Sequence, residues 1–202
     1  MVKIKICGIT RVEDALAAAK AGTDSIGFYF FPNSPRSITQ ETAKTIKAAL
    51  PSEVKTVGIF RNETVDKVYE IFNETGMDMI QLQGEEDPDH PKHFFGPVIK
   101  AIRVKDKNDI KMMVDFHISF PMVDQPVAMT SNGEKAFNWK FAIEASKYGM
   151  VILSGGLTIE NIQEAIKKVN PYGVDIGSGI ESSPGVMDHT KMKEIIGLAK
   201  AC

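Results

Sequence analysis

The sequence predicts a single (β/α)8 TIM barrel that spans residues 1–202, and three observations support this fold class. Short apolar runs of strand character alternate with amphipathic helical segments along the whole chain, a pattern typical of a parallel sheet covered by helices. Eight such units fit at about 25 residues each, and eight is the number that closes this kind of barrel. No segment with the composition of a linker interrupts the series, which favours one barrel over two domains or a doubly wound sheet.

The first unit shows the pattern most clearly. An apolar strand over residues 4–7 is followed by Thr10 and Glu13, which have the spacing of a helix capping box. Gly22 stands where a helix C-terminus favours glycine. The residues between them place one apolar stripe at helical spacing, formed by Val12, Ala15, Leu16 and Ala19.

The second and third units repeat this arrangement. A strand over residues 25–30 leads to a helix through residues 43–50, which Pro51 ends. A strand over residues 55–60 then leads to a helix over residues 65–72, which ends before Gly76.

The later units are less regular. A strand over residues 79–82 precedes a segment, 85–95, that contains Pro88 and Pro91 and has room only for a short helix. The remaining strands are predicted over residues 98–103, 119–124, 150–154 and 173–176. Their helices are predicted near residues 108–114, 139–146, 158–169 and 192–199, with a polar loop over residues 125–135.

The composition excludes several function classes. The chain has 24 Lys and Arg against 26 Asp and Glu, and no basic stripe indicates nucleic acid. No apolar run approaches the roughly 20 residues of a membrane span, and the N-terminus is too short and too alternating for a signal peptide. Cys7 and Cys202 are interpreted as free thiols of a cytoplasmic chain. The four histidines are scattered, so we expect no metal.

Active sites of this barrel lie at the C-terminal ends of the strands and in the loops that follow. Cys7 occupies such a place, and two interpretations are open. It is either a small buried apolar residue or a reactive thiol, with a pKa that is lowered by the N-terminus of a capped helix. Asp124 ends the sixth strand, as a cap for the next loop or as an acid whose pKa burial raises. Arg36 follows Pro35 and is either an exposed surface charge or a guanidinium that recognises a carboxylate through two parallel hydrogen bonds.

Two glycine-rich loops follow the seventh and eighth strands, where this barrel commonly binds phosphate. The first contains Gly155 and Gly156, and the second contains Gly177, Ser178 and Gly179. Exposed backbone N–H groups before a helix favour an anion. Glycine is common in ordinary turns, so each loop alone is weak evidence, and the pair at these two strands is stronger.

Six stretches in the same order across the whole chain resemble the phosphoribosylanthranilate isomerase family. They are KICGIT (5–10), FPNSPRSI (31–38), IQLQG (80–84), Asp124, LSGGL (153–157) and VDIGSGIE (174–181). The first two are specific to that family, whereas the glycine-rich ones are shared with other phosphate-binding barrels.

The resemblance implies an Amadori rearrangement of N-(5-phosphoribosyl)anthranilate to 1-(o-carboxyphenylamino)-1-deoxyribulose 5-phosphate in tryptophan biosynthesis. By resemblance, Asp124 is the general acid and Cys7, as thiolate, is the general base. Arg36 then binds the anthranilate carboxylate, Asp175 a sugar hydroxyl, and the two glycine loops the phosphate. No cofactor is implied, because the substrate nitrogen serves as the electron sink. The expected partner is this small phosphorylated substrate alone, without nucleic acid or membrane, and the expected state is a monomer or a homodimer.

The sequence departs from the family pattern at four places, which leave the acid and base untouched. These are Gln83 in place of histidine, residues 130–132 in a less glycine-rich loop, Asn138 in place of aspartate, and Gly177 in place of serine. The altered loop after Asp124 is expected to affect closure over the substrate. Two alternatives stay open: a barrel acting on another phosphorylated sugar, such as an epimerase or an isomerase of a histidine-pathway aminoaldose, and a barrel that binds a sugar phosphate without turnover.

Overall fold

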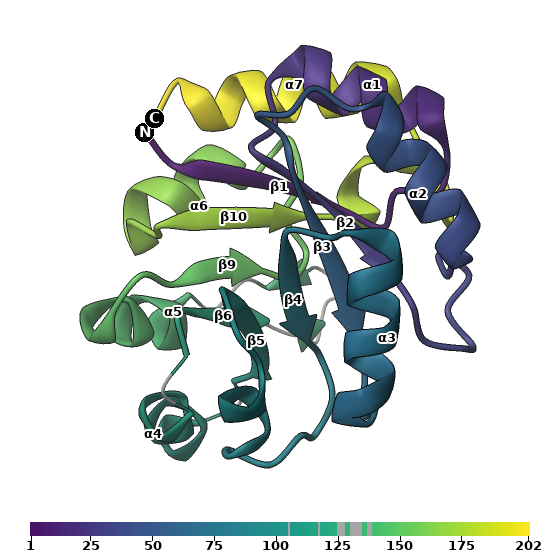
Figure 1. The fold of residues 1–202 in the computed structure, drawn as a ribbon. Helices are drawn as coiled ribbons and strands as arrows, with labels where there is room; N and C mark the ends of the chain where they lie inside the picture. The colour runs from purple at the N-terminus through teal and green to yellow at the C-terminus, as the bar shows by residue number, and fades with distance from the viewer. Residues whose placement is uncertain (105, 117, 125–127, 130–134, 137–138) are drawn as a thin grey trace.

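Eight parallel strands close into a barrel in the computed structural model, which describes residues 1–202 except 105, 117, 125–127, 130–134 and 137–138 (Figure 1). Around the barrel the strands follow the order β1-β10-β9-β6-β5-β4-β3-β2. They are β1 (Lys3–Cys7), β2 (Ser25–Tyr29), β3 (Lys55–Phe60), β4 (Met79–Leu82), β5 (Val98–Arg103), β6 (Phe120–Asp124), β9 (Ile152–Ser154) and β10 (Gly173–Ile176). The predicted (β/α)8 barrel is confirmed.

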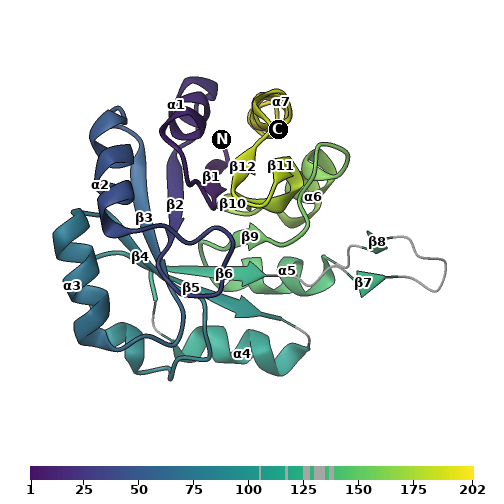
Figure 2. The ribbon, with the colours of Figure 1, turned by 90° about the vertical axis from the view of Figure 1, so that its right-hand side faces the viewer.

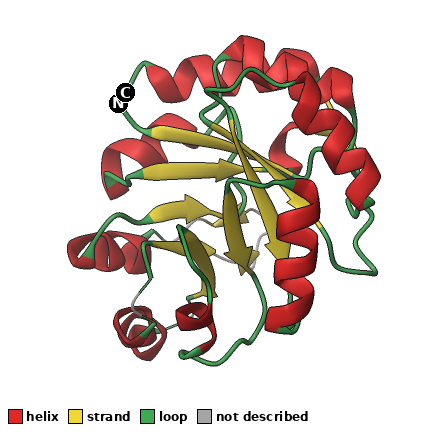
Figure 3. Ribbon diagram, in the orientation of Figure 1, coloured by secondary structure: helices red, strands yellow, loops and turns green. Residues whose placement is uncertain are grey.

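The helices form a ring around the strands (Figure 2), and strand and helix alternate along the chain (Figure 3). The α-helices are α1 (Val12–Ala21), α2 (Gln40–Ala49), α3 (Val65–Thr75), α4 (Lys107–Asp115), α5 (Lys140–Ala145), α6 (Ile162–Val169) and α7 (His189–Lys200). Short 3₁₀ turns are η1 (His90–His93), η2 (Ser146–Tyr148) and η3 (Ser178–Ile180). As predicted, the proline-containing segment after β4 holds only one such turn, η1, which begins with a proline in its first turn.

Two small antiparallel ladders add to the barrel. One pairs β11 (Glu181–Ser183) with β12 (Val186–Met187). The other pairs β7 (Ala128–Met129) with β8 (Lys135–Ala136), and this ladder projects away from the ring of helices (Figure 2). The second ladder replaces part of the loop predicted over residues 125–135. The departures from the family pattern at residues 130–132 and 138 lie outside the described residues.

The start of α1 differs from the prediction. Its N-cap is Arg11, and no side chain caps it, because the Thr10 hydroxyl donates instead to the Gly185 carbonyl oxygen at 2.5 Å. The predicted capping box is therefore wrong. The predicted stripe is also wrong at Leu16, which is 43% exposed. The predicted end is confirmed, since Gly22 has a φ of 95°.

The inner face of α1 is built from Ala15, Ala18 and, against the pattern, Asp14. All of the Asp14 side chain is buried, and it accepts two hydrogen bonds from Arg11 and one from the Met187 backbone N–H. Its Oδ1 also lies 2.7 Å from Nε2 of His189, the first residue of α7. This carboxylate therefore joins α1 to the start of α7, which lies beside it (Figures 1 and 2).

Alternating side chains of the strands separate two cores. On β1, Ile4 and Ile6 pack outward against the helices, so Lys5 and Cys7 project into the barrel. Around Cys7 the barrel interior is lined by the apolar side chains of Val57, Ile59, Ile99, Ala101, Met122 and Ile152. The polar side chains of Gln81 and Asp175 are buried there as well. The strand period thus places a lysine and a cysteine inside the barrel, one above the other. No helix in the described ranges is long and apolar enough to cross a membrane.

Candidate active site

A cleft at the C-terminal end of the barrel brings together every residue that the sequence assigns to the site. It consists of two adjoining hollows of about 190 Å³ and about 400 Å³, which share Gln83 and Asp124. The smaller hollow is lined by Cys7, Tyr29, Arg36, Gln83, Asp124, Ser154, Gly155, Gly156, Leu157, Asp175, Gly177, Ser178 and Gly179. The larger is lined by Phe31, Arg61, Asn62, Gln83, Gly84, Glu85, Ala101, Arg103 and Asp124.

Cys7 is the last residue of β1 and is 4% exposed at the bottom of the smaller hollow. Burial, and next the Asp175 carboxylate, raise the pKa of the thiol to about 11, although Lys5 and Tyr29 act in the opposite direction. The predicted lowering of this pKa is wrong. Since α1 begins only at Val12, the interior of the barrel and not a helix N-terminus sets the environment of the sulfur.

A buried ion pair lies beneath the sulfur. Lys5 Nζ is 2.8 Å from Asp175 Oδ1, and the two side chains are 4% and 6% exposed. Burial lowers the pKa of Lys5, but the negative groups at Asp175 and Cys7 outweigh it and leave that pKa raised. The other carboxylate oxygen of Asp175 accepts a hydrogen bond from Ser154 Oγ at 3.3 Å. Because Asp175 lines the cleft and Lys5 lines a cavity of about 310 Å³ at the opposite end of the barrel, the pair forms the floor between them.

Asp124 lies at the boundary of the two hollows, at the end of β6. Burial raises the pKa of its carboxyl, and the negative charge of Asp175 adds to the effect. Arg103, its register neighbour on β5, acts in the opposite direction. The direction agrees with the prediction from the sequence, and a carboxyl with a raised pKa is suited to donate a proton.

Arg36 is held by a carboxylate that the sequence reasoning gave no role. Its Nε and Nη2 donate to the two oxygens of Glu181 at 2.6 and 2.5 Å. The Gly185 N–H also donates to Glu181 Oε1, so the β11–β12 ladder supports the loop that carries Arg36. This bidentate pair uses one edge of the guanidinium, and the donors of Nη1 remain for a second acceptor.

The two glycine loops approach each other closely. Gly155 and Gly156 have φ values of 95° and 62°, which side chains rarely adopt. A Cβ on Gly179 would overlap the carbonyl oxygen of Leu157 in the other loop. In the part of the chain that the structure describes, no backbone carbonyl outside the helices and strands accepts from the N–H groups of Gly156, Ser178 and Gly179, so these groups are suited to an anion.

The helix after the first glycine loop begins later than predicted. It starts at Ile162, and a turn precedes it in which the Thr158 N–H donates to Asn161 Oδ1 and Asn161 Nδ2 donates to the Gly156 carbonyl oxygen. The prediction that a helix N-terminus directly follows this loop is wrong. The N–H groups that face the cleft from this loop therefore belong to the loop itself and not to a helix N-terminus.

Sequence reasoning gave no place to two side chains that contact the predicted site residues, Lys5 beside Asp175 and Tyr29 beside Cys7. The signal for Lys5 was present, since a charged residue at an inward strand position between Ile4 and Ile6 needs a buried partner. Tyr29 at the end of β2 carried no signal, because an aromatic residue is ordinary in a strand. Gln83, where the family has histidine, accepts a hydrogen bond from Gln81 Nε2 at 3.2 Å. Among the described residues, no group of side chains has the make-up of a metal site.

Comparison with known proteins supports the same assignment. Residues 4–197 match the family model described as N-(5'phosphoribosyl)anthranilate (PRA) isomerase. The N-(5'-phosphoribosyl)anthranilate isomerases of Pelobacter propionicus and Geotalea uraniireducens are 43% and 44% identical over 202 residues, covering 99% of this chain and 96% and 99% of theirs. The crystal structure of the Thermotoga maritima enzyme superposes with a TM-score of 0.93 at 35% identity over the full length of both chains. A structure of phosphoribosyl anthranilate isomerase in complex with reduced 1-(o-carboxyphenylamino)-1-deoxyribulose 5-phosphate superposes with a TM-score of 0.91, at 35% identity over 100% of both chains. The chain belongs to the N-(5'-phosphoribosyl)anthranilate isomerase family.

Proposed function

We propose a division of the family reaction among the residues of this cleft. That reaction, which this chain catalyses in tryptophan biosynthesis, converts N-(5'-phosphoribosyl)anthranilate into 1-(o-carboxyphenylamino)-1-deoxyribulose 5-phosphate. One observation supports the division most: the acid, the base and the anion-binding groups expected from the sequence all line one hollow.

Asp124 is the general acid of the first step. Its carboxyl donates a proton to the furanose ring oxygen while the bond from C1′ to that oxygen breaks. The nitrogen lone pair forms the C1′=N bond of an iminium ion, so the ring opens without a cofactor. The raised pKa of Asp124 supports this role, because it keeps a larger fraction of the carboxyl protonated near neutral pH.

Cys7 is the general base of the second step. Its thiolate takes the proton from C2′, and the electrons of that C–H bond move into the iminium to give an enaminol. Return of a proton to C1′ and loss of the one on the C2′ hydroxyl give the ketose, so the atoms of substrate and product balance. Proton transfers of this kind each contribute about 10²–10⁴-fold to the rate.

Three further groups bind the substrate. The free edge of Arg36 binds the anthranilate carboxylate, and Asp175 accepts a hydrogen bond from a sugar hydroxyl. The phosphate lies between the loop of Gly155 and Gly156 and the loop that contains Gly177, Ser178 and Gly179. Their location around the smaller hollow, with Cys7 and Asp124, supports this placement.

The partner we propose is the phosphorylated substrate alone, without nucleic acid or membrane. The Thermotoga maritima relative is described as dimeric in a solved structure of its engineered monomers, and for this chain we propose a monomer or a homodimer. The two cysteines are free thiols, which supports a place in the cytoplasm.

The test follows the loss of substrate fluorescence in the purified chain and its variants. Cys7→Ala and Asp124→Asn are each expected to lower kcat by about 100-fold or more, because each removes one proton transfer. Cys202→Ala removes the exposed thiol and is the matched control, expected to keep full activity. Full activity of a folded Cys7→Ala variant would disprove the base role, and substrate binding without turnover by the unmodified chain would instead indicate a binding protein.

A further inference from the structure

We propose that Tyr29 is a positioning residue for the reaction, whose phenol holds the Cys7 sulfur and donates a hydrogen bond to the thiolate. The inference rests on the proposed role of Cys7 as the base. It adds a residue that neither the sequence pattern nor the expected site contains.

The geometry places the phenol beside the sulfur. Tyr29 ends β2 and Cys7 ends the adjacent β1, with Cys7 in register with Gly27. Tyr29 Oη lies 3.2 Å from Cys7 Sγ, which is hydrogen-bonding distance for a sulfur. Both residues line the smaller hollow, so the contact lies where the proposed substrate binds.

The ring is fixed from several sides. It packs edge-on against Phe31 with 5.1 Å between ring centroids, and the backbone carbonyl oxygen of Tyr29 accepts a hydrogen bond from the Ile38 N–H at 3.0 Å. A Cβ at position 8 would lie 3.3 Å from the Tyr29 ring, so the glycine at this position leaves room for the ring. A hydroxyl on a ring held this way stays close to the sulfur without a further loss of side-chain freedom.

The surroundings of the sulfur explain why a neutral donor matters. The charged groups that face Cys7 are Lys5, Asp175 and, from the loop after β2, Arg36. Lys5 is bound to Asp175 and Arg36 to Glu181, so each cation is already neutralised by a carboxylate. Tyr29 therefore supplies a hydrogen-bond donor that brings no charge of its own and no competing anion.

The phenol stays protonated under the conditions in which it must donate. A negative charge at Cys7, burial and Asp175 together raise the pKa of Tyr29 far above its usual value. The hydrogen bond in turn lowers the pKa of the thiol. In the structure the Cys7 thiol donates to the Tyr29 oxygen. Once the thiol ionises this direction reverses, because a thiolate only accepts and the phenol still holds its proton.

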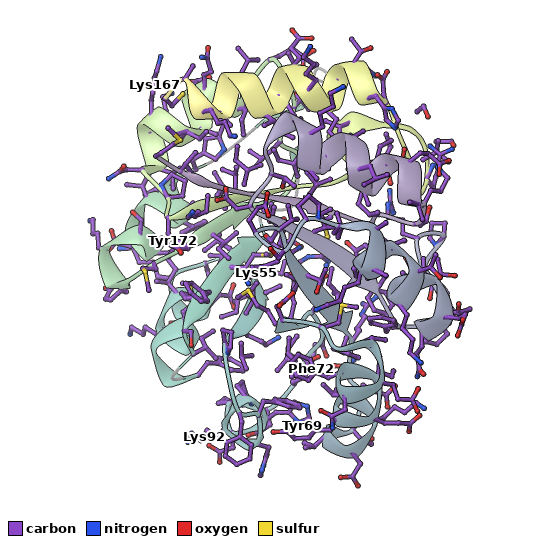
Figure 4. All side chains as sticks on the ribbon, turned by 45° about the horizontal axis from the view of Figure 1, so that its top comes forward. Lys55, Tyr69, Phe72, Lys92, Lys167 and Tyr172 are labelled. Carbon is purple, nitrogen blue, oxygen red and sulfur yellow. The ribbon has the colours of Figure 1, made fainter. Side chains whose placement is uncertain are left out.

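The test uses two single-hydroxyl deletions in a Cys202→Ser background, which leaves Cys7 as the only thiol. Tyr29→Phe removes the proposed donor. Tyr69, labelled in Figure 4, lies on α3. Tyr69→Phe is the matched control, because among the described residues the Tyr69 hydroxyl bonds the backbone of His93 and Phe95 and no side chain of the site. The pH dependence of Cys7 alkylation by iodoacetamide reports the thiol pKa without any turnover, and the pH dependence of kcat reports the base.

Hydrogen bonds to charged groups predict that Tyr29→Phe raises the thiol pKa by about one to two units. Alkylation at a fixed pH below the pKa then slows several-fold, and the ascending limb of the kcat profile moves to higher pH by the same amount, while KM stays within about twofold. Tyr69→Phe is expected to change neither profile. A second variant carries 3,5-difluorotyrosine at position 29, whose more acidic phenol is a stronger donor and shifts the thiol pKa downward.

Each outcome separates the two proposals. An unchanged thiol pKa in both position-29 variants overturns the inference about Tyr29, whatever Cys7 does. A thiol pKa that shifts while the kcat profile stays in place overturns the base role of Cys7, and with it a catalytic use of the Tyr29 contact. Parallel shifts of both, in opposite directions for the two variants, support the inference.

Discussion

Replacing Lys5 by methionine is expected to destabilise the barrel and to reduce turnover, for separable reasons. The Lys5–Asp175 pair is 2.8 Å long, and its side chains are only 4% and 6% exposed. Removing one partner of a buried ion pair costs about 3–5 kcal/mol, since the other charge loses its compensation inside the protein. That is at least about a fifth of the roughly 5–15 kcal/mol that stabilises a typical domain.

The chain offers a control on the same strand. Lys3 pairs with Asp24 at 2.7 Å, a similar distance, but these side chains are 56% and 33% exposed. Lys3→Met is therefore expected to cost under about 1 kcal/mol. Urea unfolding followed by circular dichroism gives both free energies. Equal costs for Lys5→Met and Lys3→Met would refute the reasoning, because burial is the only large difference between the two pairs.

A double variant separates stability from catalysis. Lys5→Met combined with Asp175→Leu replaces the pair by apolar side chains and is expected to recover most of the lost stability. Its activity is not expected to return, because the carboxylate that we propose binds a sugar hydroxyl is missing from the cleft. A double variant that is stable and fully active would show that the pair is structural only.

Two further predictions concern the two glycine loops and the stability of the chain at low pH. Gly179→Ala forces the second glycine loop away from the Leu157 carbonyl. We expect this variant to raise KM and the inhibition constant of inorganic phosphate, and to lower the free energy of unfolding by about 1–3 kcal/mol. Gly197→Ala, whose new Cβ meets no atom within 4 Å, is the control in both assays. Burial raises the pKa of Glu86, but the hydrogen bonds from Lys100 and other donors outweigh it and leave that pKa lowered. The ionised Glu86 therefore stabilises the folded chain above the ordinary pKa of about 4.5, and this stabilisation is lost as the pH falls through the pKa of Glu86 in the folded chain. Glu86→Gln is expected to unfold at lower urea concentration at pH 7. Its urea midpoint is also expected to fall less than that of the unmodified chain as the pH drops below about 4.5. An unchanged dependence of the urea midpoint on pH would contradict this.

The barrel was predictable because its signals are local. Strand period and apolar runs place Ile4 and Ile6 outside and Cys7 inside, and a strand end followed by a loop places Asp124 at the mouth. Active sites of this fold lie at the C-terminal ends of the strands, so the positions of Cys7 and Asp124 followed from the strand pattern. The roles assigned to them, and those of Arg36 and Asp175, came instead from the family resemblance.

The errors in α1 share one cause, which is a partner far along the chain. Thr10 has the spacing of a capping residue, but its hydroxyl binds Gly185, 175 residues away. Asp14 lies on the inner face of α1 because His189 and the Met187 N–H satisfy it there. Leu16 correspondingly lies exposed on that helix. Local periodicity contains no information about such partners.

The pKa of Cys7 was misjudged for a related reason. A helix N-terminus in the sequence suggested a stabilised thiolate, whereas burial in the barrel has the larger effect and raises the pKa to about 11. The effect of burial depends on the closure of all eight strands, which no local pattern expresses. The carboxyl of Asp124 was easier, because burial alone decides the direction of its shift.

The raised pKa of Cys7 has a consequence for the order of the two proton transfers. A thiolate with a pKa near 11 is a strong base but a rare one at neutral pH, and a base works best when its pKa lies near the operating pH. In the mechanism that we propose, protonation of the ring oxygen by Asp124 creates an iminium cation next to C2′, within the hollow that Cys7 lines. A new positive charge in a buried site lowers the pKa of a neighbouring thiol, in the same direction as Lys5 and Tyr29. In the proposed mechanism the acid step therefore prepares the base step, because ring opening raises the thiolate fraction of Cys7 at the stage when the C2′ proton has become acidic enough to be removed.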